Sequence, residues 1–329
     1  MSRPEIMKRS FRRCLLCAAF SAAAVPLLTT AQSFPSKSIR VFTAEPGGGL
    51  DMLGRLIGQG AAPSLGQPMI ILNRGADSGV EAAVTVAKAP PDGHTLLLYG
   101  STMWTQPFLR ANLPYDPVRD FAPITVAVVS INVLVVNRAL PVRNVKELIS
   151  LAKARPGELN YASGPAGTTT QLAAELLMQM TGTKMVRVNY RGNAPAIADV
   201  ISGQVQLMFP TSGVGALHVK SGRLKGLAVT SAEPSPLFPG MPTVAESGVP
   251  GFESVTMSGL FAPTDTPAAI IQRLNQEVVR VLNMAEVKTI LMNSGVEVVG
   301  SAPEHLASML KSEMAKWGKV IKAAGVRAE

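Results

Sequence analysis

Cysteine is nearly absent from this sequence, which has only two, Cys14 and Cys17. Both lie within the first 31 residues, in a stretch that has the features of an export signal. Once this stretch is removed, the remaining 298 of the 329 residues contain no cysteine. A disulfide framework, a thiol nucleophile and a cysteine-based metal site are therefore excluded.

Histidine is also scarce, and the familiar catalytic motifs are missing. The three histidines, His94, His218 and His305, are far apart and lack the spacing of a metal-binding pair. The sequence has no Gly-x-Ser-x-Gly elbow, no Walker A lysine and no His-Glu-x-x-His motif. We therefore expect a protein that is not an enzyme and that uses no metal and no cofactor.

Basic residues are in excess but do not cluster. The formal charge is +9, of which the first 31 residues contribute +4 through five Lys/Arg and one Glu, so about +5 remains. No run of five or six basic residues occurs, and this argues against nucleic acid as a partner. A mild positive charge suits anionic small molecules, whereas an aromatic content of 5% offers no obvious stacking platform.

Residues 1–31 are predicted to be a cleaved signal peptide. A basic segment ends at Arg13, an apolar stretch follows from Leu15 to Leu28, and small residues precede Gln32. The apolar stretch is short for a membrane anchor and contains Pro26. We therefore expect cleavage near Ala31 and a periplasmic location, reached by either the general or the twin-arginine route.

The segment Ile39–Ile57 combines a short β-type run, a glycine-rich loop and an amphipathic helix. The loop contains Gly47, Gly48 and Gly49, and the helix is expected to begin near Leu50 and Asp51. Glycines allow close backbone approach to a ligand, and the first N–H groups of a helix lack partners at the positive end of its dipole. Such a junction can bind an anion, although it also occurs as a plain connector.

The rest of the chain alternates β-type runs with helical patterns, which predicts an α/β fold with parallel strands. A second cycle begins near Asn144 and contains another glycine-rich loop at 163–170. Long crossovers at 121–137 and 228–256 indicate two Rossmann-like lobes with a two-segment hinge, as in a clamshell. We expect residues 32–130 plus 255–329 in one lobe and 131–254 in the other. The tail helix at 303–323 is expected to pack on the first lobe.

Ligand contacts are predicted where the strands end, because ligands of α/β sheets bind at the carboxyl ends of the strands. Asp51 is expected to cap helix N–H groups, to bind a bridging water or ligand ammonium, or simply to complement the helix dipole. The predicted ligand-binding residues are Gly47, Gly48, Gly49, Leu50, Asp51, Ser101, Ser163, Gly164, Gly167, Thr168, Thr169, Thr170 and Thr211.

Several motifs resemble those of the Bug-type receptors, the periplasmic solute-binding subunits of tripartite tricarboxylate transporters. The matching stretches cover nearly all of the chain after the signal, and include residues 34–40, 46–51, 65–68, 86–97, 113–117, 159–163, 227–231, 241–246 and 317–320. The resemblance implies a Venus-flytrap receptor that holds an organic carboxylate between two loops, here Gly47–Asp51 and Ser163–Thr170. It also implies delivery of the ligand to membrane transporter subunits, and we expect the receptor to be a monomer.

The resemblance also has departures that concern the pocket. Leu50 stands where the family usually has Thr, and Met257 where an aromatic residue is common, which indicates a more apolar pocket. Two other functions stay open: a ligand-sensing subunit for a signalling partner, and a Rossmann-type enzyme. The contiguous glycines lack the Gly-x-Gly-x-x-Gly spacing that such an enzyme needs.

Overall fold

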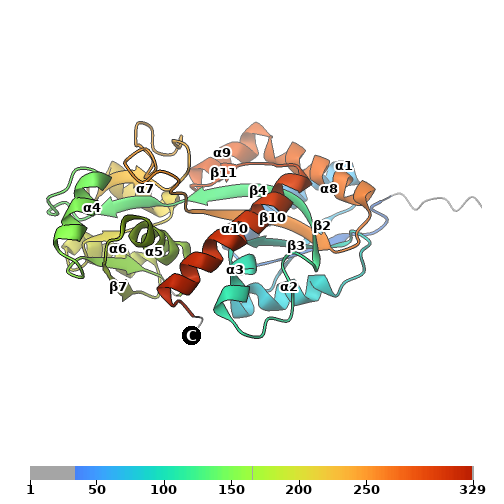
Figure 1. The fold of residues 1–329 in the computed structure, drawn as a ribbon. Helices are drawn as coiled ribbons and strands as arrows, with labels where there is room; N and C mark the ends of the chain where they lie inside the picture. Colours follow the sequence, from blue (N-terminus) through green and yellow to red (C-terminus); the bar gives the residue numbers. More distant parts are fainter. Residues whose placement is uncertain (1–33, 165, 328–329) are drawn as a thin grey trace, which may run out of the picture. The chain divides into compact units, whose positions relative to one another are not determined.

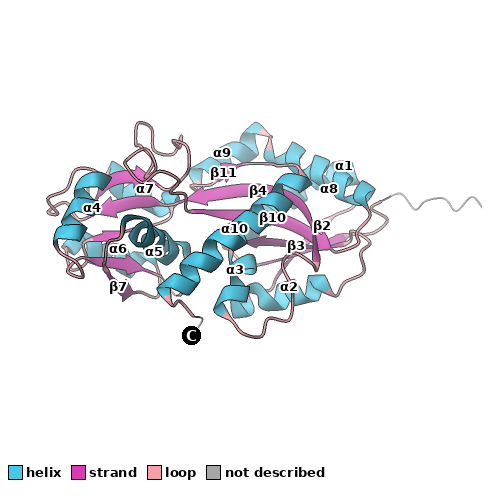
Figure 2. Cartoon of the chain, in the orientation of Figure 1, coloured by secondary structure: helices cyan, strands magenta, loops and turns pink. Residues whose placement is uncertain are grey.

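The computed structural model describes residues 34–164 and 166–327. The predicted signal peptide lies outside these residues. The described chain contains two β-sheets, each covered by helices (Figures 1 and 2). We call the six-stranded sheet with its helices the first lobe and the five-stranded sheet with its helices the second lobe. No helix in the described part of the chain is long and apolar enough to span a membrane.

The sheet of the first lobe is mixed. Its strand order is β11 (Glu297–Val298), β4 (Phe121–Ile131), β10 (Val255–Pro263), β3 (Thr95–Gly100), β1 (Ile39–Thr43) and β2 (Met69–Asn73). β1 pairs in parallel with β2 and β3, whereas β10 is antiparallel to both β3 and β4. The parallel strands were predicted from their short apolar runs, but no strand was predicted at β10.

Helices cover both faces of this sheet. One face carries α1 (Gly49–Leu65), α8 (Ala268–Leu282) and α9 (Ala285–Asn293). The other face carries α2 (Val80–Ala87), which follows the short 3-10 helix η1 (Ala76–Gly79), and α3 (Thr102–Leu109). α1 buries Leu53, Ile57, Ala61 and Leu65, a four-residue spacing that keeps one stripe against the sheet.

The second lobe has the strand order β7 (Val186–Asn189), β6 (Asn160–Ser163), β8 (Leu207–Met208), β5 (Val133–Val136) and β9 (Lys225–Val229). Its helices are α4 (Val145–Ala154), α5 (Thr169–Thr181), α6 (Asn193–Ser202) and α7 (Ser212–Lys220). Asn144 caps the start of α4, because its Oδ1 accepts a hydrogen bond from the Glu147 N–H at 2.9 Å. The observed α/β fold with two lobes confirms the predicted fold class.

The chain crosses between the lobes at buried polar residues. β4 and β5 were expected as one long run, but Asn132 separates them and marks the passage from one sheet to the other. The Asn132 N–H donates to Thr230 Oγ1 at 2.8 Å, and this hydroxyl donates to the Asn132 carbonyl at 2.9 Å. These bonds join the two crossover segments where both side chains are fully buried.

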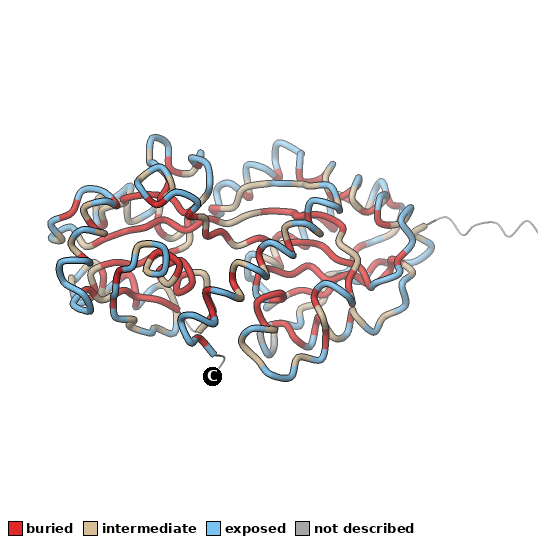
Figure 3. The backbone as a smooth tube through the Cα atoms, in the orientation of Figure 1, coloured by how far each residue is buried: buried red, intermediate tan, exposed pale blue. Residues whose placement is uncertain are grey.

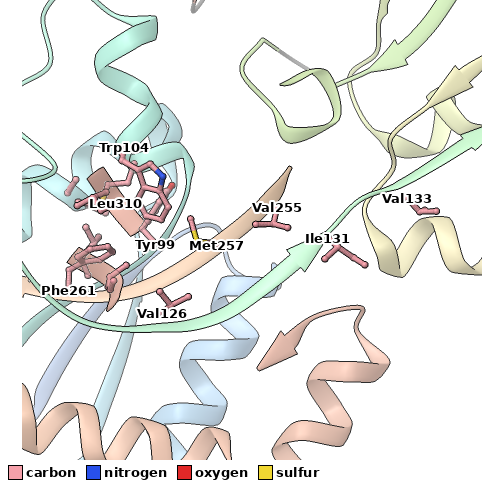
Figure 4. Packing of buried hydrophobic residues seen from close by; sticks show 14 of the residues in the cluster. Tyr99, Trp104, Val126, Ile131, Val133, Val255, Met257, Phe261 and Leu310 are labelled. Carbon is pink, nitrogen blue, oxygen red and sulfur yellow. The ribbon is translucent and has the colours of Figure 1, made fainter. Parts of the chain in front are cut away.

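The final helix α10 (Pro303–Ala324) packs on both lobes (Figure 1). Leu306 and Leu310 pack in one buried cluster with Trp104 and Phe261 of the first lobe (Figure 4). Trp317, Val320 and Ile321 pack instead in the core of the second lobe. This helix was expected to pack on the first lobe, but only its N-terminal half does so.

The central strands form the most deeply buried layer of each lobe (Figure 3). Within the first lobe, Trp104 and Phe121 each make an edge-on contact with Phe261, at centroid distances of 6.2 and 6.3 Å. Each buried large apolar side chain contributes about 1.5–3 kcal/mol to folding. The strand ends and the loops that follow them are thereby held on a rigid support.

Candidate functional site

The glycine loop between β1 and α1 places residues without side chains at the start of α1. Gly47 has φ +76°, a conformation that favours glycine, and the Gly48 N–H donates to the Glu45 carbonyl at 3.3 Å. α1 has no side-chain cap at Gly48, and its first backbone bond runs from the Met52 N–H to the Gly48 carbonyl. The N–H groups of Gly49, Leu50 and Asp51 therefore have no acceptor within their own helix.

Asp51 holds this loop in place. Its carboxylate accepts hydrogen bonds from the Gly47 N–H at 3.0 Å, from Arg55 Nε at 3.1 Å and from Asn73 Nδ2 at 2.9 Å. The bond from Arg55 and those from Gly47 and Asn73 lower the pKa of this nearly buried carboxyl to about 2. Asp51 is therefore an ionised acceptor with its charge paired inside the protein.

A pocket of about 370 Å³ opens beside the first turn of α1. Its walls come from both lobes: α1, α9 and the turn that joins α9 to β11 in the first lobe, and the first turn of α7 in the second. The crossover strands β4 and β10 form its floor. Its lining residues are Gly49, Leu50, Leu53, Val128, Ser130, Thr211, Gly213, Ser258, Leu291, Ser294 and Val296.

Strand alternation explains which side chains of the floor line the pocket. Val128 and Ser130 are two residues apart on β4 and therefore share one face, toward α1 and α9. On β10, Ser258 lines the pocket, whereas its neighbour Met257 is buried on the opposite face near Tyr99 (Figure 4). Met257 was expected to make the pocket more apolar, but it belongs to the core instead.

Only some of the predicted site residues line this pocket. Gly49, Leu50 and Thr211 line this pocket together. Gly47, Gly48 and Asp51 shape the loop next to it. Ser101 is buried, and its hydroxyl accepts a hydrogen bond from the Met257 N–H at 3.0 Å, so it ties the start of α3 to β10.

The second predicted loop, Ser163–Thr170, does not line this pocket. Its groups bond to each other: Gly164 N–H donates to Thr170 Oγ1 at 2.9 Å, and Thr168 Oγ1 lies 3.0 Å from Thr170 Oγ1. The Gly167 N–H donates to Gln171 Oε1 at 2.9 Å, and Thr169 begins α5. A Cβ atom at Gly167 would lie 2.8 Å from Leu109 Cδ1, so this loop lies against α3 of the first lobe.

Sequence reasoning missed several polar residues. Arg187 donates to Ser163 Oγ and to the Gly164 carbonyl, both at 2.7 Å, and so brings a positive charge to the second loop. Ser130 was missed because it is one hydroxyl within an apolar run, and Ser258 because no strand was predicted at β10. A hydroxyl within an apolar strand is the signal from which Ser130 could have been predicted as a site residue.

The lobes touch beside the pocket. Ser212 Oγ, at the start of α7, donates to the Gly295 carbonyl at 2.5 Å, and a Cβ atom at Gly213 would lie 2.9 Å from the Ser294 carbonyl oxygen. The first turn of α7 is therefore packed against the turn that joins α9 to β11. No group of three or more His, Cys, Asp or Glu residues in the described chain could hold a metal ion.

The sequence is similar to those of curated proteins over nearly its whole length. The chain is 35% identical to "UPF0065 protein in tcbD-tcbE intergenic region" of Pseudomonas sp. strain P51, over 97% of this chain and 96% of that protein. It is 30% identical to "Protein BugT" of Bordetella pertussis, over 93% of this chain and 95% of that protein.

The chain is also similar to solved structures in both sequence and fold. The structure described as "R. palustris Rpa4515 with adipate" has a TM-score of 0.73 at 35% identity and covers 90% of this chain and all of that one. "MatC (Rpa3494) from Rhodopseudomonas palustris with bound malate" has a TM-score of 0.70 at 31% identity and covers 88% of this chain and all of that one.

The family model described as "Tripartite tricarboxylate transporter family receptor" matches residues 53–326. This match agrees with the relatives, with the two-lobed fold and with the motifs at both ends of the chain. The chain therefore belongs to the tripartite tricarboxylate transporter receptor family, as its motifs predicted, and is a solute receptor rather than an enzyme.

Proposed function

We propose that this receptor binds a small organic carboxylate between its lobes, with the carboxylate at the first turn of α1. The observation that carries the proposal is the uncapped start of α1, which opens on a pocket that the second lobe also lines. The two neighbours described with adipate and malate support a carboxylate as the ligand class.

The energetics are adequate for such a ligand. A carboxylate at a helix N-terminus gains about 0.3–2 kcal/mol from the dipole, and each hydrogen bond to a charged group contributes about 1.5–3 kcal/mol. Two or three bonds from the N–H groups of Gly49 and Leu50 and the hydroxyl of Thr211 approach the roughly −8 kcal/mol of a micromolar complex. The paired charge of Asp51 offers little repulsion, because Arg55 lies 3.0 Å away.

We further propose a location, a partner and a division into lobes, and membership of the receptor family supports the first two. The protein acts in the periplasm after cleavage near Ala31, as a monomer, and delivers its ligand to the two membrane subunits of a tripartite transporter. The lobes comprise residues 32–130 plus 255–329 and residues 131–254, with hinges at the two crossovers. Ser163–Thr170, with Arg187, contributes to ligand binding when the lobes move.

Leu50 allows a direct test, because it is the second residue of α1. An acidic side chain in a first helical turn favours the helix, so Leu50→Asp should fold, yet it places a negative charge where the carboxylate binds. We expect organic acids to raise the melting temperature of the native protein and their amides to leave it unchanged. Leu50→Asp should weaken acid binding at least tenfold.

Leu50→Asn is the matched control, since it has nearly the same size but no charge. It should lose only the apolar contact of Leu50, and should therefore bind the acids at least tenfold more tightly than Leu50→Asp does. Equal loss in both variants would show that only the leucine side chain matters. Stabilisation by amides as strong as by acids would reject the carboxylate site.

A further inference from the structure

The pocket beside α1 has a consequence for the class of carboxylate, and this consequence rests on the proposed function. No charged side chain is among its lining residues in the described chain. Its polar side chains are four hydroxyls, from Ser130, Thr211, Ser258 and Ser294. Five apolar side chains make up the rest, from Leu50, Leu53, Val128, Leu291 and Val296.

The nearby charges are already engaged. Asp51 is paired with Arg55, whose guanidinium donates to it through Nε and lies 3.0 Å from it through a second nitrogen. On β11, Glu297 accepts a hydrogen bond from Ser235 Oγ at 2.5 Å. A negative group placed in the pocket would therefore find hydroxyl donors but no counter-ion among the lining side chains.

Burial of an ion without a partner is strongly unfavourable, whereas burial of apolar groups against apolar walls is favourable. Leu50 belongs to the first turn of α1 and also lines the pocket, so a ligand whose carboxylate lies at this turn extends its other end along Leu50. The size of the pocket, about 370 Å³, is within the range of small-molecule sites.

We infer that this receptor selects monocarboxylates with an uncharged, largely apolar tail over dicarboxylates of the same length. The first carboxylate binds at the first turn of α1, and the tail lies between Val128, Leu291 and Val296. The hydroxyls of Ser130 and Ser258 at the floor accommodate a neutral polar substituent on that tail. This preference differs from the dicarboxylates named for the two neighbours, adipate and malate.

The test compares pairs of acids that differ only in the distal group. Hexanoate and adipate have the same six carbons, and benzoate and terephthalate share one ring. Calorimetry with the native protein should give at least tenfold tighter binding of the monocarboxylate in the pair that fits the pocket. Equal or tighter binding of the dicarboxylate would overturn the inference while leaving a carboxylate receptor intact.

A charge introduced at the pocket should reverse this preference. Ser294 is exposed at the end of α9, and Ser294→Arg would place a guanidinium at the pocket edge without disturbing the core. We expect Ser294→Arg to shift the ratio of the two affinities toward the dicarboxylate at least fivefold. Ser294→Gln, of similar length but neutral, should keep the native ratio.

The outcomes separate this inference from the proposed function. If neither acid of either pair binds, the proposed carboxylate site fails and the inference fails with it. If the acids bind but Ser294→Arg and Ser294→Gln behave alike, the tail does not lie in this pocket. Only selective binding of the monocarboxylate together with the shift in Ser294→Arg supports the inference.

Discussion

Asp51 illustrates how one side chain can shape a proposed anion site without binding the anion itself. Its carboxylate orients Gly47, Arg55 and Asn73 around the turn that precedes α1. Because Arg55 compensates its charge, the neighbouring N–H groups of α1 stay available to a second anion. The sequence indicated a role for Asp51 at this helix, but its partners come from three separate positions, and only the folded chain brings Asn73 beside it.

Asp51→Asn should lower the free energy of unfolding by about 1–2 kcal/mol at neutral pH, because hydrogen bonds to a charged acceptor are lost. The folded pKa of about 2 lies below the ordinary value of 3.8. The stabilisation from Asp51 is therefore complete above pH 4 and is lost as the pH falls toward 2. Urea unfolding across this range should show the native protein and the variant converging.

Glu81→Gln provides the control for this prediction, since Glu81 pairs with Arg74 at the surface and both side chains are about half exposed. Such a pair contributes little, so the variant should remain within about 0.5 kcal/mol of the native protein. A gap between Asp51→Asn and the native protein that stays constant from pH 5 to pH 2 would contradict the assigned role of Asp51.

Gly47 and Gly49 differ in what they require of the backbone. Gly47→Ala should cost about 1–2 kcal/mol, because its φ of +76° is strained for alanine. Gly49→Ala should be neutral or slightly stabilising, because a Cβ atom there meets nothing within 4 Å. Thermal unfolding of both variants measures the difference, and equal costs would show that the loop does not need its left-handed residue.

Much of the first loop could be predicted from the sequence, because three glycines before an amphipathic helix constrain the local backbone. The pocket could not. Ser130 and Ser258 lie on strands that become neighbours only through the antiparallel pairing of β4 with β10. β10 itself was missed because Gly259 and the polar residues Thr256 and Ser258 interrupt its apolar pattern. The strand β10 and the pocket floor therefore depend on long-range strand pairing, which local periodicity does not reveal.

At the scale of elements, α10 connects the two cores. Trp317 is 1% exposed, packs in the second lobe and donates through Nε1 to Glu313 Oε2 at 2.6 Å. The spacing of the buried residues of α10 places them in one stripe along the helix. Which lobe each half of the stripe contacts depends on the direction of the helix across the molecule, and periodicity carries no information on that direction.

Trp317→Ala should lower the free energy of unfolding by about 3–5 kcal/mol, because it removes a large buried ring. Leu217→Ala is the comparison, since Leu217 is 68% exposed and its loss should change stability by less than about 0.5 kcal/mol. Urea unfolding followed by far-ultraviolet circular dichroism measures both variants, and in Trp317→Ala the fluorescence comes from Trp104 alone, a fully buried residue of the other lobe. A small cost for Trp317→Ala would mean that α10 does not connect the cores.

At the scale of the whole molecule, the closeness of the lobes depends on the contact between α7 and the turn after α9. Gly213→Ala should push this contact apart, because its Cβ atom would lie 2.9 Å from a backbone oxygen that cannot rotate away. Ligand affinity should fall about tenfold, with little change in the stability of either lobe. Gly192→Ala, which meets nothing within 4 Å, is the control.

Small-angle scattering would measure the spacing of the lobes in these variants. In the presence of saturating ligand, Gly213→Ala should keep a larger radius of gyration than Gly192→Ala. Identical radii and affinities would show that the packing at Gly213 does not limit closure.

The central claim is that a carboxylate binds at the first turn of α1. The most direct measurement is the titration of isotope-labelled protein with hexanoate or benzoate and with the matching amides, observed through the backbone N–H resonances. The account predicts that the acids shift the N–H protons of Gly49 and Leu50 more than any others and that the amides do not. Unchanged resonances at these two residues, with the largest shifts at Ser163–Thr170 instead, would contradict it.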